Sequence, residues 1–236
     1  MVEQREVWID GRAYAVTVSD EREALLAAMA DGGAAVAVLG SRGADSGLWC
    51  CPYAVEQKKD ADEAFLERVL RRTLGLPWII ARTKRLIIRE FAKEDACSAG
   101  TGEKGSGDDC VFADQELLSA YIKNQYQVFG WGIWALEERE SGRLIGRAGL
   151  SESGLGYHIY EPYRGLGYAA EACRAIVEYA SRELEMESLA VVTAADNTAS
   201  VRTALSLGFV PEPGEDAGLV RMILRLKHLP DGAVRE

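Results

Sequence analysis

Apolar residues recur along the chain either at every second position, which predicts a strand, or three to four positions apart, which predicts a helix. Two short alternating segments flank Asp10-Gly11 and predict a β-hairpin, because this dipeptide suits a type I′ turn. Residues 34–39 form a continuous apolar run, which is typical of a buried strand. Helices are predicted after Asp20 and after Asp60, where an acidic residue in a capping position precedes apolar residues spaced three to four apart.

A stop signal divides this pattern into two domains. Gly75 and Pro77 end the second predicted helix, and a new series of strands and helices follows. We therefore assign residues 1–77 to a small α/β accessory domain and residues 79–236 to a second domain with its own core.

The second domain carries the longer series of elements. Strands are predicted over residues 84–91, 131–136, 143–150, 155–160 and 189–193, followed by a last strand in which Val220, Met222, Leu224 and Leu226 share a buried face. Helices are predicted from Asp114 and over residues 168–186. By contrast, residues 98–109 have a glycine-rich linker composition that cannot bury a core, and the tail from Pro230 is expected to fray.

The composition is that of an ordinary globular protein, with 48% hydrophobic and 27% charged residues among 236. No apolar run approaches the roughly 20 residues of a membrane span, and the N-terminus does not have the pattern of a signal peptide. We expect a cytoplasmic protein with no membrane partner. The net charge of −10 argues against a nucleic-acid partner. It would attract a cationic acceptor, or it serves solubility alone.

The cysteines and histidines do not indicate a metal site. The five cysteines have no C-x-x-C spacing, so we read them as free thiols in a reducing compartment. The two histidines, His158 and His228, lack the spacing of metal ligands.

A glycine loop at residues 163–171 is the strongest functional signal. It follows a predicted strand and opens the amphipathic helix, so its amides lie at the positive end of a helix dipole, where phosphate binds. The glycine spacing is neither that of a dinucleotide fingerprint nor that of a P-loop. A nucleotide-dependent enzyme is therefore disfavoured.

The loop has the pattern R-x-x-G-x-A, formed by Arg164, Gly167 and Ala169. This pattern resembles the coenzyme A pyrophosphate loop of the GNAT-superfamily N-acetyltransferases. Two other segments resemble the same family: N-x-x-S at Asn197 and Ser200, followed by Gly208-Phe209, and a first strand at residues 83–91. The match is closest to the branch that acetylates the N-termini of ribosomal proteins, and it covers roughly residues 79–227.

The resemblance implies an α/β fold with a mixed, centrally splayed sheet and acetyl-CoA as cosubstrate. It places the pantetheine arm of the cofactor on backbone groups of Ile159 and Tyr160 and on Asn197, whose alternative role is a helix N-cap. It places the pyrophosphate at the loop. The residues implied there are Arg164, Gly165, Leu166, Gly167, Tyr168 and Ala169.

Transfer to an amine requires groups that handle two protons. The ammonium must lose a proton, and a carboxylate near the strand before the loop could accept it; Glu152 and Glu161 are candidates, with solvent-facing charge as the alternative. The leaving thiolate needs a hydrogen-bond donor. Many family members place a Tyr seven residues after the Asn, where this chain has Ala204. As in the ribosomal-protein branch, Ser200 could donate instead, or it could cap the helix.

The sequence thus predicts an N-acetyltransferase that moves an acetyl group from acetyl-CoA to a primary amine, either a protein N-terminus or a small amine. The alternative is a coenzyme A-binding module without transfer activity. Ala204 and the glycine-rich segment at residues 98–109 favour that alternative.

Overall fold

The computed structural model describes residues 1–41, 43, 47–96, 109–213 and 218–226. The chain divides into two compact units, Met1–Trp78 and Ile79–Glu236. Most of the segment predicted to be a linker (residues 98–109) and the tail from Pro230 lie outside the described residues.

The first unit contains a four-stranded sheet of order β1-β2-β3-β4. Its elements are β1 Val2–Ile9, β2 Arg12–Ser19, α1 Arg22–Ala30, β3 Ala34–Val38, β4 Ala54–Val55, η2 Lys58–Asp60 and α2 Glu63–Thr73. The predicted hairpin joins β1 and β2, and Asp10 and Gly11 both have positive φ, +50° and +79°, as a type I′ turn requires. β2, β3 and β4 pair in parallel.

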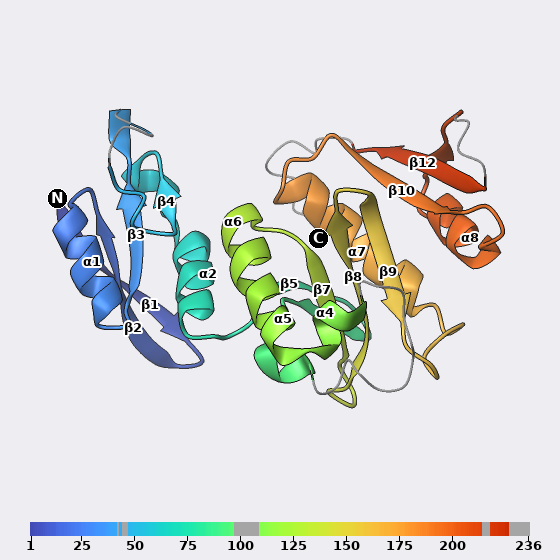
Figure 1. Cartoon of the computed structure of the whole chain (residues 1–236), viewed down its shortest axis with the longest axis horizontal. Coiled ribbons are helices and arrows are strands. Elements are labelled where there is room, and N and C mark those ends of the chain that lie inside the picture. The colour runs from blue at the N-terminus through green and yellow to red at the C-terminus, as the bar shows by residue number, and fades with distance from the viewer. Residues whose placement is uncertain (42, 44–46, 97–108, 214–217, 227–236) are drawn as a thin grey trace, which may run out of the picture. The chain divides into compact units, whose positions relative to one another are not determined.

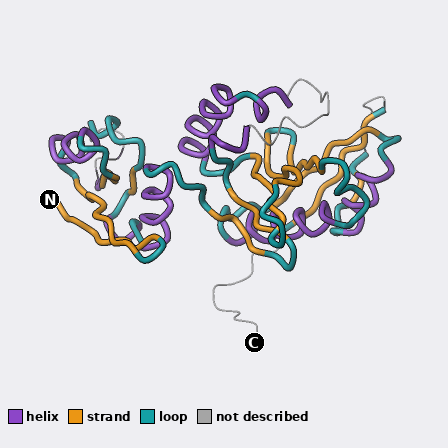
Figure 2. The backbone as a smooth tube through the Cα atoms, turned by 90° about the horizontal axis from the view of Figure 1, so that it is seen from below, coloured by secondary structure: helices purple, strands orange, loops and turns teal. Residues whose placement is uncertain are grey.

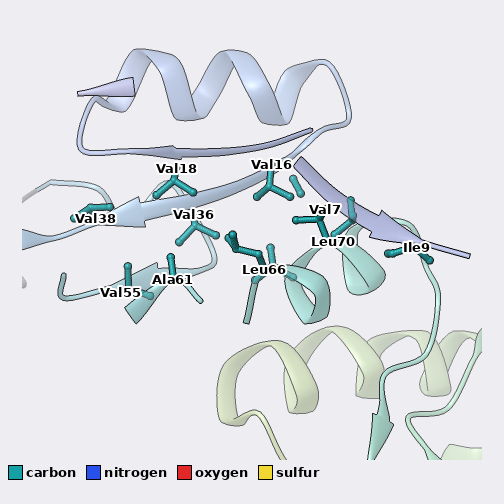
Figure 3. Packing of buried hydrophobic residues seen from close by; sticks show 12 residues of the cluster. Val7, Ile9, Val16, Val18, Val36, Val38, Val55, Ala61, Leu66 and Leu70 are labelled. Carbon is teal, nitrogen blue, oxygen red and sulfur yellow. The ribbon is translucent and has the colours of Figure 1, made fainter. Parts of the chain in front are cut away.

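Two apolar clusters cover the two faces of this sheet. On one face, Leu66 and Leu70 of α2 pack against strand residues such as Val7 and Val16 (Figure 3). On the other face, Leu25 of α1 lies in a smaller cluster. The unit therefore has a core of its own.

Both predicted helix caps are wrong by one or two residues. α1 begins after Glu21, because the Asp20 carboxylate pairs with the amino group of Met1 instead of capping the helix. α2 is capped by Asp62, whose side chain accepts from the Phe65 N–H at 2.8 Å. Asp60 closes the preceding turn instead. Several acidic residues compete locally for each cap, and other contacts decide among them.

The second unit holds two sheets, one of order β5-β6-β7-β8-β9 and one of order β10-β12-β11. The elements of the first sheet and its helices are β5 Ile79–Arg82, β6 Leu86–Arg89, η3 Lys93–Asp95, α4 Asp109–Ala113, α5 Gln115–Tyr121, η4 Ile122–Tyr126, α6 Gln127–Phe129, β7 Ile133–Glu138, β8 Leu144–Ser151 and β9 Gly154–Ile159. The remaining elements are α7 Tyr168–Arg182, β10 Ser188–Ala194, α8 Thr198–Ser206, β11 Val210–Pro211 and β12 Leu219–Arg225. The helix predicted from Asp114 begins one residue later as α5, and Asp114 is its cap, accepting from Glu116 N at 2.8 Å and Leu117 N at 2.9 Å.

Helices cover both faces of the five-stranded sheet (Figure 2). α7 covers one face, where Ile176 is fully buried and Tyr179 packs edge-on against Trp134 with ring centroids 5.5 Å apart. The segment α4 to α6 covers the other face, where Phe112 and Leu118 are buried against Ala135. The strands between these layers carry the candidate site.

No helix in the part of the chain that the structure describes is long and apolar enough to cross a membrane.

Candidate functional site

The site begins at an opening between β9 and β10, which belong to different sheets and share no described ladder. The two strands meet at Gly154, where a Cβ would lie only 2.1 Å from the carbonyl oxygen of Ala190. Gly154 also has a φ of +111°, which side-chain-bearing residues rarely adopt. From this contact β10 runs at an angle away from β9 (Figure 1). The strands therefore splay, as the resemblance implied.

The register of β9 decides which backbone groups face the opening. Tyr160 donates its N–H to the Ile145 carbonyl at 2.9 Å, and its own carbonyl accepts from Tyr163 N at 2.8 Å, so both groups bond inside the unit. Backbone groups alternate in direction along an antiparallel strand, so those of Ile159 and Tyr157 point away from β8. Of the two predicted contacts for the cofactor arm, Ile159 faces the opening. The other residue of β9 whose backbone groups face the opening is Tyr157, two residues before Ile159. The period of two along a strand was the signal in the sequence that could have identified it.

The glycine loop ends at the start of α7, as predicted. Gly167 is the N-cap with a φ of +83°, and Gly165 has a φ of +74°. The amide of Glu171 makes the first helical bond, to the Gly167 carbonyl at 3.2 Å. The amides of residues 167–169 belong to the first turn of the helix, whose N–H groups have no partner within it, and those of residues 165 and 166 lie in the loop just before. This arrangement of amides suits an anion such as a pyrophosphate.

Arg85 and Glu171 tie the loop to the start of β6. Glu171 accepts from Thr83 Oγ1 at 2.6 Å, from Arg85 N at 2.9 Å and from Arg85 Nε at 2.7 Å. Arg85 also donates to the Leu166 carbonyl at 2.9 Å, and its guanidinium lies 4.2 Å from the centroid of the Tyr168 ring. Burial alone would raise the pKa of Glu171, but the bonds from Thr83 and Arg85 hold it below its usual value. We call this set of contacts the Arg85 clamp; sequence analysis missed it.

Tyr168 anchors the other side of the loop. Its ring is buried, and its hydroxyl donates to Glu138, which also accepts from Ser141 Oγ at 2.6 Å. The bonds from Ser141 and Tyr168 lower the pKa of Glu138, and the bond to Glu138 raises the pKa of Tyr168. Tyr168 was predicted as a cofactor contact through the loop backbone, and its side chain holds that backbone in place.

Arg164 lies in the loop between β9 and α7. It donates from Nε to the Ile159 carbonyl at 2.8 Å and pairs with Glu161 at 3.1 Å. The Glu161 side chain is 71% exposed. This pairing and exposure favour the solvent-facing alternative for Glu161 over a role as general base.

Asn197 and Ser200 lie at the start of α8. The Asn197 side chain accepts from the backbone N–H of Ser200 at 3.1 Å, so Asn197 is the N-cap. The Ser200 hydroxyl is not used in that cap; it accepts from the Tyr157 hydroxyl at 3.3 Å. Ala204 is buried one turn further along. Two hydroxyl groups, one from β9 and one from α8, therefore lie together beside the opening.

A cavity of about 630 Å³ lies between the α4 to α6 segment and strands β8 and β9. Its walls include the aromatic rings of Phe112, Tyr121 and Trp131. Tyr157 and Glu152 also line it. Glu152 is exposed in the turn between β8 and β9, so the cavity reaches one of the two predicted catalytic residues. The other, Ser200, is bonded to Tyr157, which is among the lining residues.

This geometry agrees with a comparison of the sequence with known families. The family model described as the GNAT acetyltransferase domain matches residues 85–210, more than half of the chain. The chain belongs to the GNAT acetyltransferase family. The matched residues include the glycine loop and Ser200, and they begin at Arg85.

Individual relatives match the GNAT domain over different lengths. The uncharacterized protein YkkB of Bacillus subtilis (strain 168) is 30% identical over 95 residues, which are 36% of this chain and 55% of that protein. The chain thus spans about half the length of this relative. The uncharacterized N-acetyltransferase YoaA of the same organism is 27% identical over 154 residues, which are 56% of this chain and 84% of that protein.

A solved structure shares the fold of the GNAT domain. It is RimL, a ribosomal L7/L12 alpha-N-protein acetyltransferase in complex with coenzyme A, with a TM-score of 0.51 and 14% identity over 64% of this chain and 99% of that chain. The family match and this likeness confirm the predicted N-acetyltransferase domain and its α/β fold.

Within the residues that the structure describes, no three His, Cys, Asp or Glu side chains gather in a way that could hold a metal ion.

Proposed function

We propose that the GNAT domain transfers the acetyl group of acetyl-CoA to a primary amine by direct attack of the amine on the thioester. The observation that carries this proposal is the splayed opening between β9 and β10, which leads to the glycine loop at the start of α7. The pantetheine arm would extend along the outward backbone groups of Tyr157 and Ile159. The pyrophosphate would lie against the amides of residues 165–169.

The chemistry replaces the C–S bond of the thioester with a C–N bond. The neutral amine nitrogen attacks the thioester carbonyl carbon, the C–N bond forms, and the C–S bond breaks with the electron pair leaving on sulfur. The proton that the nitrogen loses as the amide forms ends on that sulfur, which leaves as the free thiol. The leaving thiolate needs a donor, and the Ser200 hydroxyl is suited to this role because Tyr157 already donates to its oxygen. The Ser200 proton is then available to the sulfur.

The amine must also lose a proton, because a primary ammonium has a pKa of about 10. Glu152 is the proposed acceptor, directly or through water, since it lies in the turn beside the cavity. Glu161 is not proposed, because it pairs with Arg164 and is largely exposed.

The test combines two measurements on the full chain. Calorimetric titration measures acetyl-CoA affinity, and thiol release measures turnover with a panel of primary amines. We expect micromolar binding and amine-dependent thiol release that Glu152→Gln slows while acetyl-CoA affinity is retained. Binding without thiol release for any amine would contradict transfer and favour the coenzyme A-binding module.

A further inference from the structure

The cavity has an aromatic wall contributed by the α4 to α6 segment. Phe112 and Tyr121 meet edge-on with ring centroids 5.2 Å apart, and Phe129 and Trp131 meet at 5.9 Å. The Tyr121 hydroxyl accepts from the Ile133 N–H at 2.6 Å, so its polar atom is engaged with the protein. What this wall offers a ligand is therefore mainly ring surface.

The opposite side of the cavity contains a glycine that packing does not explain. A Cβ at Gly156 would meet no atom within 4 Å, although the residue lies in the middle of β9. Its cross-strand neighbour Gly149 differs, because a Cβ there would lie 2.1 Å from the Gly132 carbonyl oxygen. A glycine within a strand is otherwise unfavourable and often marks the close approach of a ligand. The space beside Gly156 is thus available to an acceptor.

The charges around the cavity limit how many positive charges an acceptor can carry. Of the described residues that line it, Glu152 alone carries a carboxylate. The same lining contains the Arg147 guanidinium, which lies 5.0 Å from the Phe112 ring centroid. One carboxylate can pair with one ammonium, whereas the further charges of a polyamine would lose water beside a guanidinium of like charge, with no second carboxylate among the described lining residues.

On these observations, and resting on the proposed transfer reaction, we propose that the acceptor is a small primary amine with one positive charge and an aromatic body. The cavity volume of about 630 Å³ is that of a small-molecule site. The ring would stack on the wall formed by Tyr121 and Trp131 and extend over Gly156. The ammonium would lie toward Glu152.

The first test measures binding selectivity in the presence of coenzyme A. 2-Phenylethylamine, n-propylamine, spermidine and a short peptide with a free N-terminus are titrated into the full chain by calorimetry. We expect 2-phenylethylamine to bind at least tenfold more tightly than each of the other three. Tighter binding of spermidine or of the peptide would overturn the proposal.

The second test fills the space beside Gly156 in steps, with Gly156→Ala, Gly156→Val and Gly156→Ile. A Cβ at this position would meet no atom within 4 Å, so the series begins in open space and is aimed at the ligand space, with the melting temperature as the check on the fold. We expect 2-phenylethylamine affinity to fall stepwise, at least tenfold for Gly156→Ile, with coenzyme A affinity unchanged and the melting temperature equal or higher, because β-branched residues favour a strand. Undiminished amine affinity in Gly156→Ile would overturn the proposal.

Because both tests measure binding, they separate this proposal from the proposed reaction. Selective amine binding without thiol release would contradict the transfer reaction and leave the acceptor class standing. Thiol release without selectivity for the aromatic amine would support the transfer reaction and overturn the proposed acceptor class.

Discussion

Removal of the Arg85 side chain should weaken the binding of acetyl-CoA without unfolding the domain. In Arg85→Ala the loop loses the ion pair with Glu171, the bond to the Leu166 carbonyl and the stacking over Tyr168. Glu171 keeps its bonds from Thr83 Oγ1 and from the backbone N–H of residue 85. The loop should therefore loosen while the helix start stays docked.

The size of the effect follows from exposure. The Arg85 side chain is 38% exposed and that of Glu171 18%, so solvent screens the pair in part. Exposed ion pairs contribute about 0.2–1 kcal/mol, and a cation–π contact at an exposed site adds about 0.5–1 kcal/mol. The bond to the Leu166 carbonyl adds about 0.5–1.5 kcal/mol, so the three contacts sum to about 1–3.5 kcal/mol. Because the Arg85 side chain is 38% exposed, solvent screening reduces this to about 1–2 kcal/mol of loop ordering. We expect acetyl-CoA affinity to fall roughly 5- to 30-fold.

The assay compares two ligands by calorimetry. Coenzyme A carries the pyrophosphate, and pantetheine lacks it, so only coenzyme A should bind more weakly to Arg85→Ala. Lys84→Ala is the matched control, because it removes one positive charge from an exposed neighbouring residue. Glu171→Gln and the double variant with Arg85→Ala complete a double-mutant cycle. If the double variant loses less coenzyme A affinity than the sum of the losses in the two single variants, Arg85 and Glu171 act together. Equal losses for both ligands, or an equal loss in Lys84→Ala, would refute the clamp.

Four further outcomes are expected. Gly167→Val should weaken coenzyme A binding at least tenfold, about 1.4 kcal/mol, because the position has a φ of +83° and lies in the anion loop; unchanged affinity by calorimetry would contradict this. Ser200→Ala should slow thiol release by about 10² with coenzyme A affinity retained, and full activity would reject the donor role. Residues 79–236 alone should bind coenzyme A, and a folded fragment that does not bind would place the first unit in the site. Because the pKa of Glu171 is lowered, its stabilising contacts are present above the ordinary value of 4.5 and are lost as pH falls through the lower folded value; an acid melting series should show this loss, reduced in Glu171→Gln.

Local signals in the sequence predicted elements whose causes are themselves local. The hairpin at Asp10-Gly11 follows from two adjacent residues that tolerate positive φ. The loop before α7 follows from Gly165 and Gly167 and the apolar period of the helix. For Asn197 the sequence left two roles open, a contact with the cofactor arm and a helix N-cap. The N-cap depends only on a hydrogen bond from the Ser200 N–H, three residues further along the chain.

Contacts between distant residues were beyond the reach of these signals. Arg85 and Glu171 are 86 residues apart, and Tyr157 and Ser200 are 43 apart. A single sequence records no pairing at such separations, so the clamp and the hydroxyl pair emerge only when the chain is folded. The same reason explains why sequence analysis did not name Tyr157, since the direction of backbone groups depends on the register with β8.

Gly154 and Gly156 of β9 link the fold to the proposed site, because glycine within a strand lowers the stability of the strand and so needs another explanation. Gly154 is required by backbone approach, since Ala190 of β10 occupies the space of its Cβ and so fixes the point where the strands meet. Gly156 is not required by any neighbour, and the space beside it belongs to the cavity. In the proposed reaction, one glycine thus sets where the strands part for the cofactor, and the other leaves room for the acceptor. Local strand propensity is given up at both positions, which is expected where function and not stability selects the residue.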